Sequence, residues 1–194
     1  MLEYPDLLLL NQLGIVDDIQ DDMYLGFNQG TISHAELLDW TTLICDKYGI
    51  ENWTLNSEGL VDVDGSVDLE DRYLIRLPLR FGWVSGAFYC DNNQLTSLKG
   101  APHKVCGTFD CRDNDLTTLK WAPQKVGGDF YCSRNQLITL EGAPQDVGRA
   151  FSCFNNELTT LEGAPKKVGN DFYCSSNNLT SLDGIGEVKG NIYK

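Results

Sequence analysis

Apolar side chains return along this chain every 21 residues, and the polar residues between them keep the same period. Each unit has a valine, a phenylalanine four residues later, a cysteine, an asparagine and two leucines. One such unit cannot bury its own apolar face, so the period predicts a solenoid of stacked units. The repeated positions are Val84, Val105, Val126, Val147 and Val168; Phe88, Phe109, Phe130, Phe151 and Phe172; Cys90, Cys111, Cys132, Cys153 and Cys174; Asn93, Asn114, Asn135, Asn156 and Asn177; and two leucines per unit, from Leu95 and Leu98 to Leu179 and Leu182.

The parts of each unit predict its local structure. Phenylalanine and cysteine alternate with polar neighbours, which is strand spacing, so stacked units should form one parallel sheet. The return path carries Gly-Ala-Pro at 100–102, 142–144 and 163–165, and Trp-Ala-Pro at 121–123. Because proline removes a backbone donor and disfavours helix before it, we expect the return side to be mostly non-helical.

The first part of the chain has other periods. Ser33 and Glu36 form a capping box before a helical stripe of apolar residues that ends near Gly49. Period-two alternation after Trp53 predicts a hairpin, and positions from Val63 onward match the repeat in degenerate form. We therefore expect an acidic helical N-terminal cap over residues 1–52, a hairpin with a degenerate first repeat over 53–83, and five full repeats and one partial repeat over 84–194.

Charge is distributed unevenly along the chain. Residues 1–72 carry 16 Asp and Glu against 2 Lys and Arg, whereas residues 73–194 carry 12 against 13. This acidity argues against direct nucleic-acid binding and favours a protein partner with a basic surface. The acidic cap residues singled out are Asp17, Asp18, Asp21 and Asp22.

Targeting signals and cysteine use indicate the compartment. The apolar run Leu7–Leu10 lacks a basic flank and a cleavage site, so we expect no signal peptide, no membrane span and a cytoplasmic location. Seven cysteines are an odd number, and five follow the repeat, which is typical of small buried apolar side chains in a reducing compartment.

The segment Phe88-x-Cys90-x-x-Asn93-x-Leu95-x-x-Leu98 resembles the leucine-rich repeat, and the Gly-Ala-Pro unit is similar to short repeats of bacterial and phage proteins. The resemblance covers residues 63–194 and implies an α/β solenoid with a parallel sheet on its concave face. It also implies a binding scaffold with a protein partner and no chemistry of its own. One departure is that Val84 lies four residues before Phe88, where the family has three.

With Phe88 and Cys90 directed inward, the residues beside them should form an outward column of the sheet. That column reads Tyr89, Asp110, Tyr131, Ser152, Tyr173 and Tyr193. Tyrosine also suits half-exposed strands, but tyrosine interleaved with charge is typical of a recognition surface. The predicted partner-binding residues are Tyr89, Asp110, Arg112, Asp129, Tyr131, Arg134, Phe154, Asp171, Tyr173 and Tyr193.

Metal and enzyme chemistry find little support in the sequence. The cysteine ladder lies between phenylalanine and leucine layers and contains no C-x-x-C pair, so we expect no metal and no cofactor. His34 and His103 are far apart in the array and have no paired nucleophile. We therefore expect the protein not to be an enzyme.

These patterns favour an adaptor or inhibitor of a host or cellular protein, and the phage resemblance would fit interference with host defence. One alternative is an acidic nucleic-acid mimic that fills a basic channel with residues 1–72. Another is a small-nucleotide sequestering protein that stacks its ligand on Tyr89, Tyr131 or Tyr173. The last strand, up to Lys194, leaves an unpaired parallel edge, which predicts homodimer formation or strand addition there.

Overall fold

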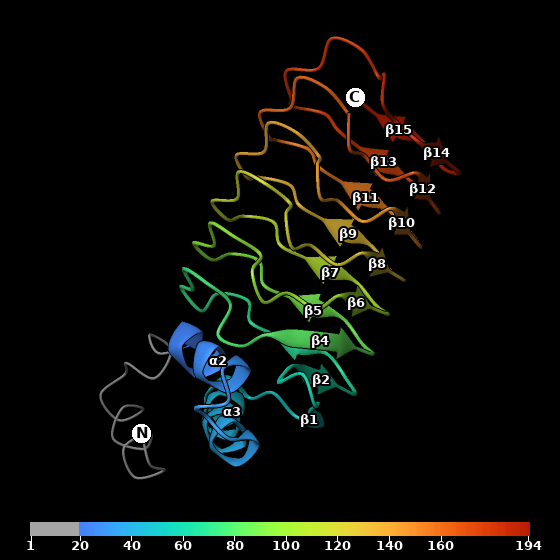
Figure 1. Cartoon of the computed structure of the whole chain (residues 1–194). Coiled ribbons are helices and arrows are strands. Elements are labelled where there is room, and N and C mark those ends of the chain that lie inside the picture. The colour runs from blue at the N-terminus through green and yellow to red at the C-terminus, as the bar shows by residue number, and fades with distance from the viewer. Residues whose placement is uncertain (1–19) are drawn as a thin grey trace.

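The computed structural model of the chain describes residues 20–194, in which two helices precede a column of stacked coils (Figure 1). Helix α2 spans Gln20–Asn28 and helix α3 spans His34–Tyr48. From residue 50 onward the described chain contains strands, turns and bends, so the return side of each coil is non-helical as expected. None of the helices in residues 20–194 is long and apolar enough to cross a membrane.

Helix α3 begins and ends at the residues that the sequence indicates. The Glu36 backbone N–H donates to Ser33 Oγ at 3.2 Å, and the Ser33 backbone N–H donates to Glu36 Oε2 at 2.8 Å. This reciprocal pair satisfies donors that the first helical turn leaves free. At the other end Gly49 adopts φ 67°, a left-handed conformation that glycine reaches without steric cost.

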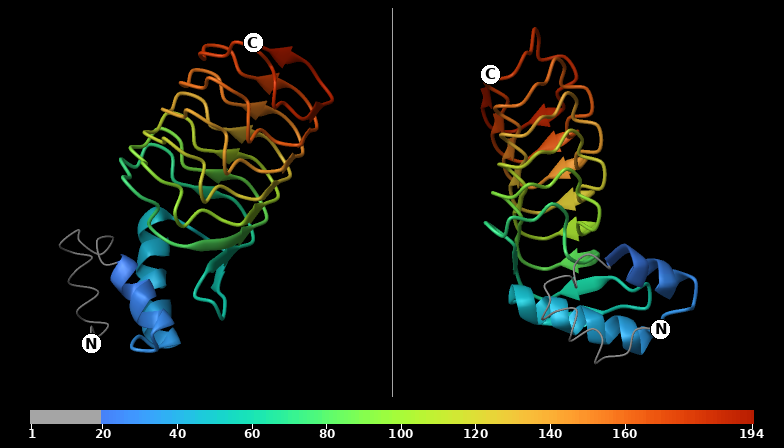
Figure 2. Two further views of the ribbon diagram at one scale, coloured as in Figure 1. Left: turned by 45° about the horizontal axis from the view of Figure 1, so that its top comes forward. Right: turned by 90° about the vertical axis from the view of Figure 1, so that its left-hand side faces the viewer.

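The helical pair packs against the first coils of the solenoid (Figure 2). Trp40 is fully buried and meets the Tyr24 ring edge to face at 5.6 Å. The Tyr24 hydroxyl accepts a hydrogen bond of 3.0 Å from the Arg80 backbone N–H, while the Arg80 guanidinium lies 4.3 Å from the Tyr24 ring centroid. Tyr24 therefore fixes α2 to the first coil through a ring contact and a hydrogen bond.

Two sheets run along the column, one on each of two adjoining walls. The first, here called the valine sheet, starts with the antiparallel hairpin of β1 and β2 that the alternation predicts and continues in parallel. The second, the phenylalanine sheet, is parallel throughout. The valine sheet contains β1 (Trp53–Leu55), β2 (Val61–Val63), β4 (Phe81–Val84), β6 (Lys104–Val105), β8 (Lys125–Val126), β10 (Asp146–Val147), β12 (Lys167–Val168) and β14 (Glu187–Val188). The phenylalanine sheet contains β3 (Val67–Asp68), β5 (Phe88–Tyr89), β7 (Phe109–Asp110), β9 (Phe130–Tyr131), β11 (Phe151–Ser152), β13 (Phe172–Tyr173) and β15 (Ile192–Tyr193).

The predicted parallel sheet of the Phe-x-Cys strands is present as the phenylalanine sheet, whereas the valine sheet was not predicted. Residues Ser85 and Gly86 bend the chain between Val84 and Phe88, so the two apolar residues enter the core from different walls. A side chain on Gly86 would have its Cβ 2.6 Å from the Gly65 carbonyl oxygen, which explains a glycine at this corner. The four-residue spacing that departs from the leucine-rich repeat is the sequence signal of this bend.

Stacked phenylalanines form the centre of the core. The rings of Phe88, Phe109, Phe130, Phe151 and Phe172 are fully buried, and successive rings are stacked at centroid separations of 5.5, 5.4, 5.4 and 5.1 Å. Burial of each ring stabilises the fold by about 1.5–3 kcal/mol, and ring stacking adds about 0.5–1.5 kcal/mol. A ring that shifted by one residue would leave its layer, so this ladder also fixes the register of the coils.

The asparagine ladder links each coil to the coil before it. The Asn135 side-chain carbonyl accepts from the Leu116 backbone N–H at 3.0 Å, and its amide group donates to the carbonyls of Cys111, Cys132 and Ser133. These are backbone groups at a turn that no strand pairing reaches, and unsatisfied groups of this kind are costly when buried. The same pattern occurs at Asn93, Asn114, Asn156 and Asn177.

Replacing one rung of this ladder tests its contribution to stability. We expect Asn135→Ala to lower the free energy of unfolding by about 3 kcal/mol or more, because it leaves several buried backbone groups without partners. The exposed residue Asn178 supplies the control, Asn178→Ala, which we expect to change stability by less than about 0.5 kcal/mol. Urea unfolding followed by circular dichroism measures both values, and equal losses would contradict a structural role for the ladder.

Candidate functional site

The outer side of the phenylalanine sheet carries the aromatic column that the sequence predicts. The surface is here called the tyrosine face and consists of Tyr89, Tyr131, Tyr173 and Tyr193 with the residues between and beside them. In-register pairing places Tyr89 next to Asp110, Asp110 next to Tyr131, and so on along the column. At its far end the rings of Tyr173 and Tyr193 stack at 4.7 Å with an interplanar angle of 5°.

A pair of buried carboxylates interrupts this face. Asp110 and Asp91 belong to neighbouring coils, and their side chains are 1% and 4% exposed. Arg112 Nη2 lies 2.9 Å from Asp110 Oδ2, and its Nε lies 3.9 Å from Asp91 Oδ2. The Arg112 guanidinium also lies 5.4 Å from the centroid of the Tyr131 ring. One cation therefore covers two carboxylates and contacts an exposed aromatic ring.

The electrostatics of this pair favour a proton. Burial and, second, the neighbouring Asp91 charge raise the pKa of Asp110 to about 7, although the Arg112 backbone hydrogen bond and guanidinium act in the opposite direction. Burial also raises the pKa of Asp91, and the carboxylates of Glu70 and Asp68 act in the same direction. Asp91 Oδ1 is buried and has no hydrogen-bond partner among the described residues. Asp110 is consequently able to hold a proton near neutral pH, and Asp91 retains unused acceptor capacity.

The remaining predicted residues of this face are divided between structural and exposed roles. Asp129 and Asp171 each accept a hydrogen bond from a backbone N–H of the next coil, at 2.9 Å and 2.7 Å. Arg134 lies 3.5 Å from Asp113 and 5.7 Å from the ring of Phe154, which is half-buried and not exposed as predicted. Ser152, Asp129 and Asp171 thus brace neighbouring coils, Asp110 is paired with Arg112 of its own coil, and the tyrosines and arginines supply accessible surface.

The predicted acidic segment is partly engaged inside the molecule. Asp17 and Asp18 lie outside the described residues. Asp21 Oδ1 lies 2.8 Å from Lys99 Nζ and 3.2 Å from Arg80 Nη2, and the hydrogen bond from Lys99 is the largest cause that lowers the Asp21 pKa. Asp22 is exposed. One of the two described members of this acidic set is therefore bound to the solenoid.

The cysteine ladder is part of the apolar core. Cys90, Cys111, Cys132, Cys153 and Cys174 are buried free thiols, and burial raises the pKa of each. Thiolate formation is therefore disfavoured, which removes the form that binds metal or attacks a substrate. Among residues 20–194, no three His, Cys, Asp or Glu side chains are grouped so that they could hold a metal ion.

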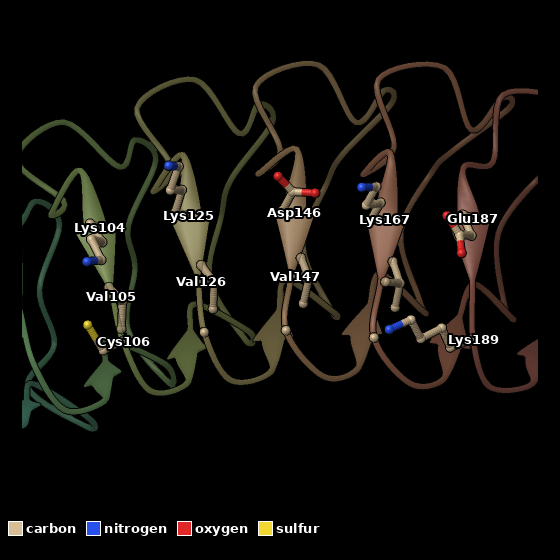
Figure 3. A pocket seen from close by; sticks show the side chains of 14 residues that line it. Lys104, Val105, Cys106, Lys125, Val126, Asp146, Val147, Lys167, Glu187 and Lys189 are labelled. Atoms are coloured by element: carbon tan, nitrogen blue, oxygen red, sulfur yellow. The ribbon is translucent and has the colours of Figure 1, made fainter.

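The sequence reading missed a groove on the outer side of the valine sheet. It has a volume of about 600 Å³, and its lining includes valines such as Val126 and Val147 (Figure 3) together with Gly127, Gly148 and Gly169. A Cβ on Gly148 would collide with the carbonyl oxygen of Gly127 in the preceding coil, so close stacking explains these glycines. The sequence indicates this groove by glycines at 127, 148 and 169, each of which follows a charged residue by two positions. One wall of the groove carries Lys104, Lys125, Asp146, Lys167 and Glu187.

Comparison with known proteins identifies no relative of this chain. The chain matches no protein-family model, and neither the curated proteins nor the solved structures yield a match. The geometry itself defines the class of protein as a repeat protein, a solenoid of parallel β-coils with a 21-residue period.

The carboxylate pair predicts a dependence of stability on pH. Because the folded state raises the pKa of Asp110 from 3.8 to about 7, the folded protein holds this proton more tightly than the unfolded chain does. The stabilising contribution is therefore complete below the unfolded pKa and is lost as the pH rises through about 7. Relative to Asp110→Asn, we expect the unfolding free energy of the wild type to fall by up to about 4 kcal/mol between about pH 4 and about pH 8.

Urea unfolding at a series of pH values measures this difference. Asp146→Asn removes an exposed carboxylate from the other sheet and controls for the loss of one charge. A difference between the wild type and Asp110→Asn that is constant or rises over this range would mean that Asp110 is ionised throughout.

Proposed function

We propose that this chain is a non-enzymatic protein-binding module of the leucine-rich repeat class that acts as an adaptor or inhibitor through its tyrosine face. The observation that carries the proposal is the in-register column in which tyrosines alternate with short polar residues across neighbouring strands. Tyrosine and arginine are enriched among residues that dominate the binding energy of protein interfaces. Rigid strands present these side chains at low cost in conformational entropy.

The charge around Asp91 supports a partner with a basic surface. Asp68, Glu70, Asp91 and Asp110 belong to one neighbourhood of the face, and Arg112 is the cation paired within it. A lysine or arginine of the partner that approached this neighbourhood would favour ionised carboxylates. Binding would then release a proton at neutral pH, and would be weakened by salt at the exposed members of the set.

The leucine-rich repeat assignment rests on the asparagine ladder and the leucine layers. Each asparagine bonds to backbone groups at the end of a strand, which is the task that the family motif gives it. In this proposal α2 and α3 act as the N-terminal cap, because they cover core residues of the first coils with Tyr24, Leu37 and Trp40. A solenoid requires such covering at its ends.

The other proposals from the sequence have less support. A nucleic-acid mimic would use the acidic groups of residues 1–72, of which Asp21 is already paired with Lys99 and Arg80 while Asp22 is exposed. Sequestration of a nucleotide on Tyr89, Tyr131 or Tyr173 would need an open ring, but Tyr173 already stacks on Tyr193 and the Arg112 guanidinium lies over Tyr131. The action against a host defence protein follows from the resemblance alone, and the homodimer through β14 and β15 stays a prediction that size-exclusion chromatography with light scattering can test.

An affinity pull-down tests the tyrosine face. We expect a protein retained by the wild type to be lost with Tyr131→Ala combined with Tyr173→Ala, because truncation of two interface aromatics typically weakens binding at least about a hundredfold. Lys125→Ala combined with Lys167→Ala changes the exposed valine sheet and serves as the matched control, with retention unchanged. Equal retention by all three proteins, or loss with the lysine variant alone, would contradict the proposal.

A further inference from the structure

A third surface lies at the corner before the valine sheet, where the repeat departs from its own pattern. Position 121 is a tryptophan, whereas the equivalent positions in other coils are Gly100, Gly142, Gly163 and Gly184. Trp121 takes φ 76°, close to the 85–97° of these glycines, so a bulky residue occupies a left-handed conformation that suits glycine. Its side chain is 56% exposed, so core packing does not account for it.

Basic residues depart from the pattern at the same corner. Arg80 stands where later coils have Ala101, Ala122, Ala143 and Ala164. Lys99 and Lys120 stand where later coils have Glu141, Glu162 and Asp183. The large aromatic residue and the cations are therefore confined to the same three coils, next to α2.

These departures enclose a cavity of about 400 Å³. Its lining combines Trp121, the backbone and small side chains of Gly100 and Ala101, and the cations Arg80 and Lys99, with His103 at its edge. This volume falls within the range of small-molecule sites, which combine apolar walls with a few convergent polar groups. The Lys120 ammonium lies 5.2 Å from the centroid of the Trp121 ring, and the 56% exposure of Trp121 leaves ring surface for a ligand. An exposed indole next to these cations favours a planar ligand that carries negative charge.

The two cations already converge on one anionic oxygen. Asp21 Oδ1 accepts from Lys99 Nζ at 2.8 Å and from Arg80 Nη2 at 3.2 Å. The geometry of the pair therefore fits an oxyanion, and Asp21 occupies the position that a ligand phosphate would take. Lys99 and the Asp21 carboxylate are each more than half exposed, so exchange of this carboxylate for a ligand needs no change in the core.

We propose that this cavity binds a nucleoside phosphate, with the base stacked on Trp121 and the phosphate held by Arg80 and Lys99 in place of Asp21. Stacking on an exposed aromatic ring tolerates any base, whereas the cation pair requires the phosphate. The site lies outside the tyrosine face, so a ligand here and a protein partner there are independent.

Isothermal titration calorimetry with ATP in magnesium-free buffer tests the proposal, with adenosine and inorganic tripolyphosphate as separate titrants. We expect ATP to bind more tightly than either fragment. Trp121→Gly should weaken ATP at least about tenfold and leave tripolyphosphate unchanged, because stacking on one aromatic ring is worth about one decade in affinity or more. Asp21→Asn should strengthen both ATP and tripolyphosphate several-fold, because it removes the competing carboxylate.

The glycine variant is also a control for folding. Glycine suits φ 76° better than tryptophan does, so Trp121→Gly should melt at the same temperature as the wild type or higher. Trp121→Phe should keep most of the ATP affinity, and Tyr131→Ala should keep all of it. The proposal is overturned if ATP does not bind at millimolar concentration, if Trp121→Gly binds ATP as the wild type does, if Asp21→Asn weakens tripolyphosphate, or if Tyr131→Ala causes the loss expected of Trp121→Gly.

Discussion

The hydrogen bonds of the asparagine ladder are the constraint on which the rest of this structure depends. Strand pairing in each sheet involves two residues per coil, so most of the backbone in a coil needs other partners. Asn135 and its equivalents satisfy carbonyls and an N–H of two coils at the turn beyond the phenylalanine sheet. Without such partners, the free-energy cost of these buried polar groups would exceed the stabilisation that the short strands contribute. The phenylalanine and cysteine layers can stack only because this turn is closed.

Given that closure, the two walls acquire different surfaces from the same backbone. The phenylalanine sheet presents one outward residue per coil, which leaves room for tyrosines and for the Asp91 and Asp110 pair. The valine sheet presents a lysine or acid beside a glycine, because the coils approach too closely there for a side chain at Gly148. The glycines of the valine sheet therefore follow from how closely successive coils approach at that wall.

The sequence predicted the repeat, the register and the helix after Ser33 because those features depend on periodic burial and local capping. It also predicted which residues share the outward column, since a fixed period makes neighbours of positions such as Tyr89 and Asp110. It did not predict the bend at Ser85 and Gly86, because period-two alternation continues through a bend. The burial of Asp110 was missed as well, since it depends on Arg112 of the same coil and on Asp91 of the coil before. Periodicity indicates whether a side chain points inward or outward, but it does not indicate how far neighbouring side chains bury it.

In-register stacking fixes the spacing between equivalent side chains along each wall of the solenoid. Equivalent side chains on adjacent coils are separated by one strand spacing, about 4.8 Å, so contacts along a wall can fall only at multiples of that length. A partner that touched Tyr131 and Tyr173, two coils apart, would have to match a separation of about 10 Å. Gain or loss of one whole 21-residue unit would change the distance between the two ends of the surface by one strand spacing. The structure of each end would stay the same. The length of the surface can therefore change in steps of one coil, whereas an insertion of any other length would disrupt the register of the coils.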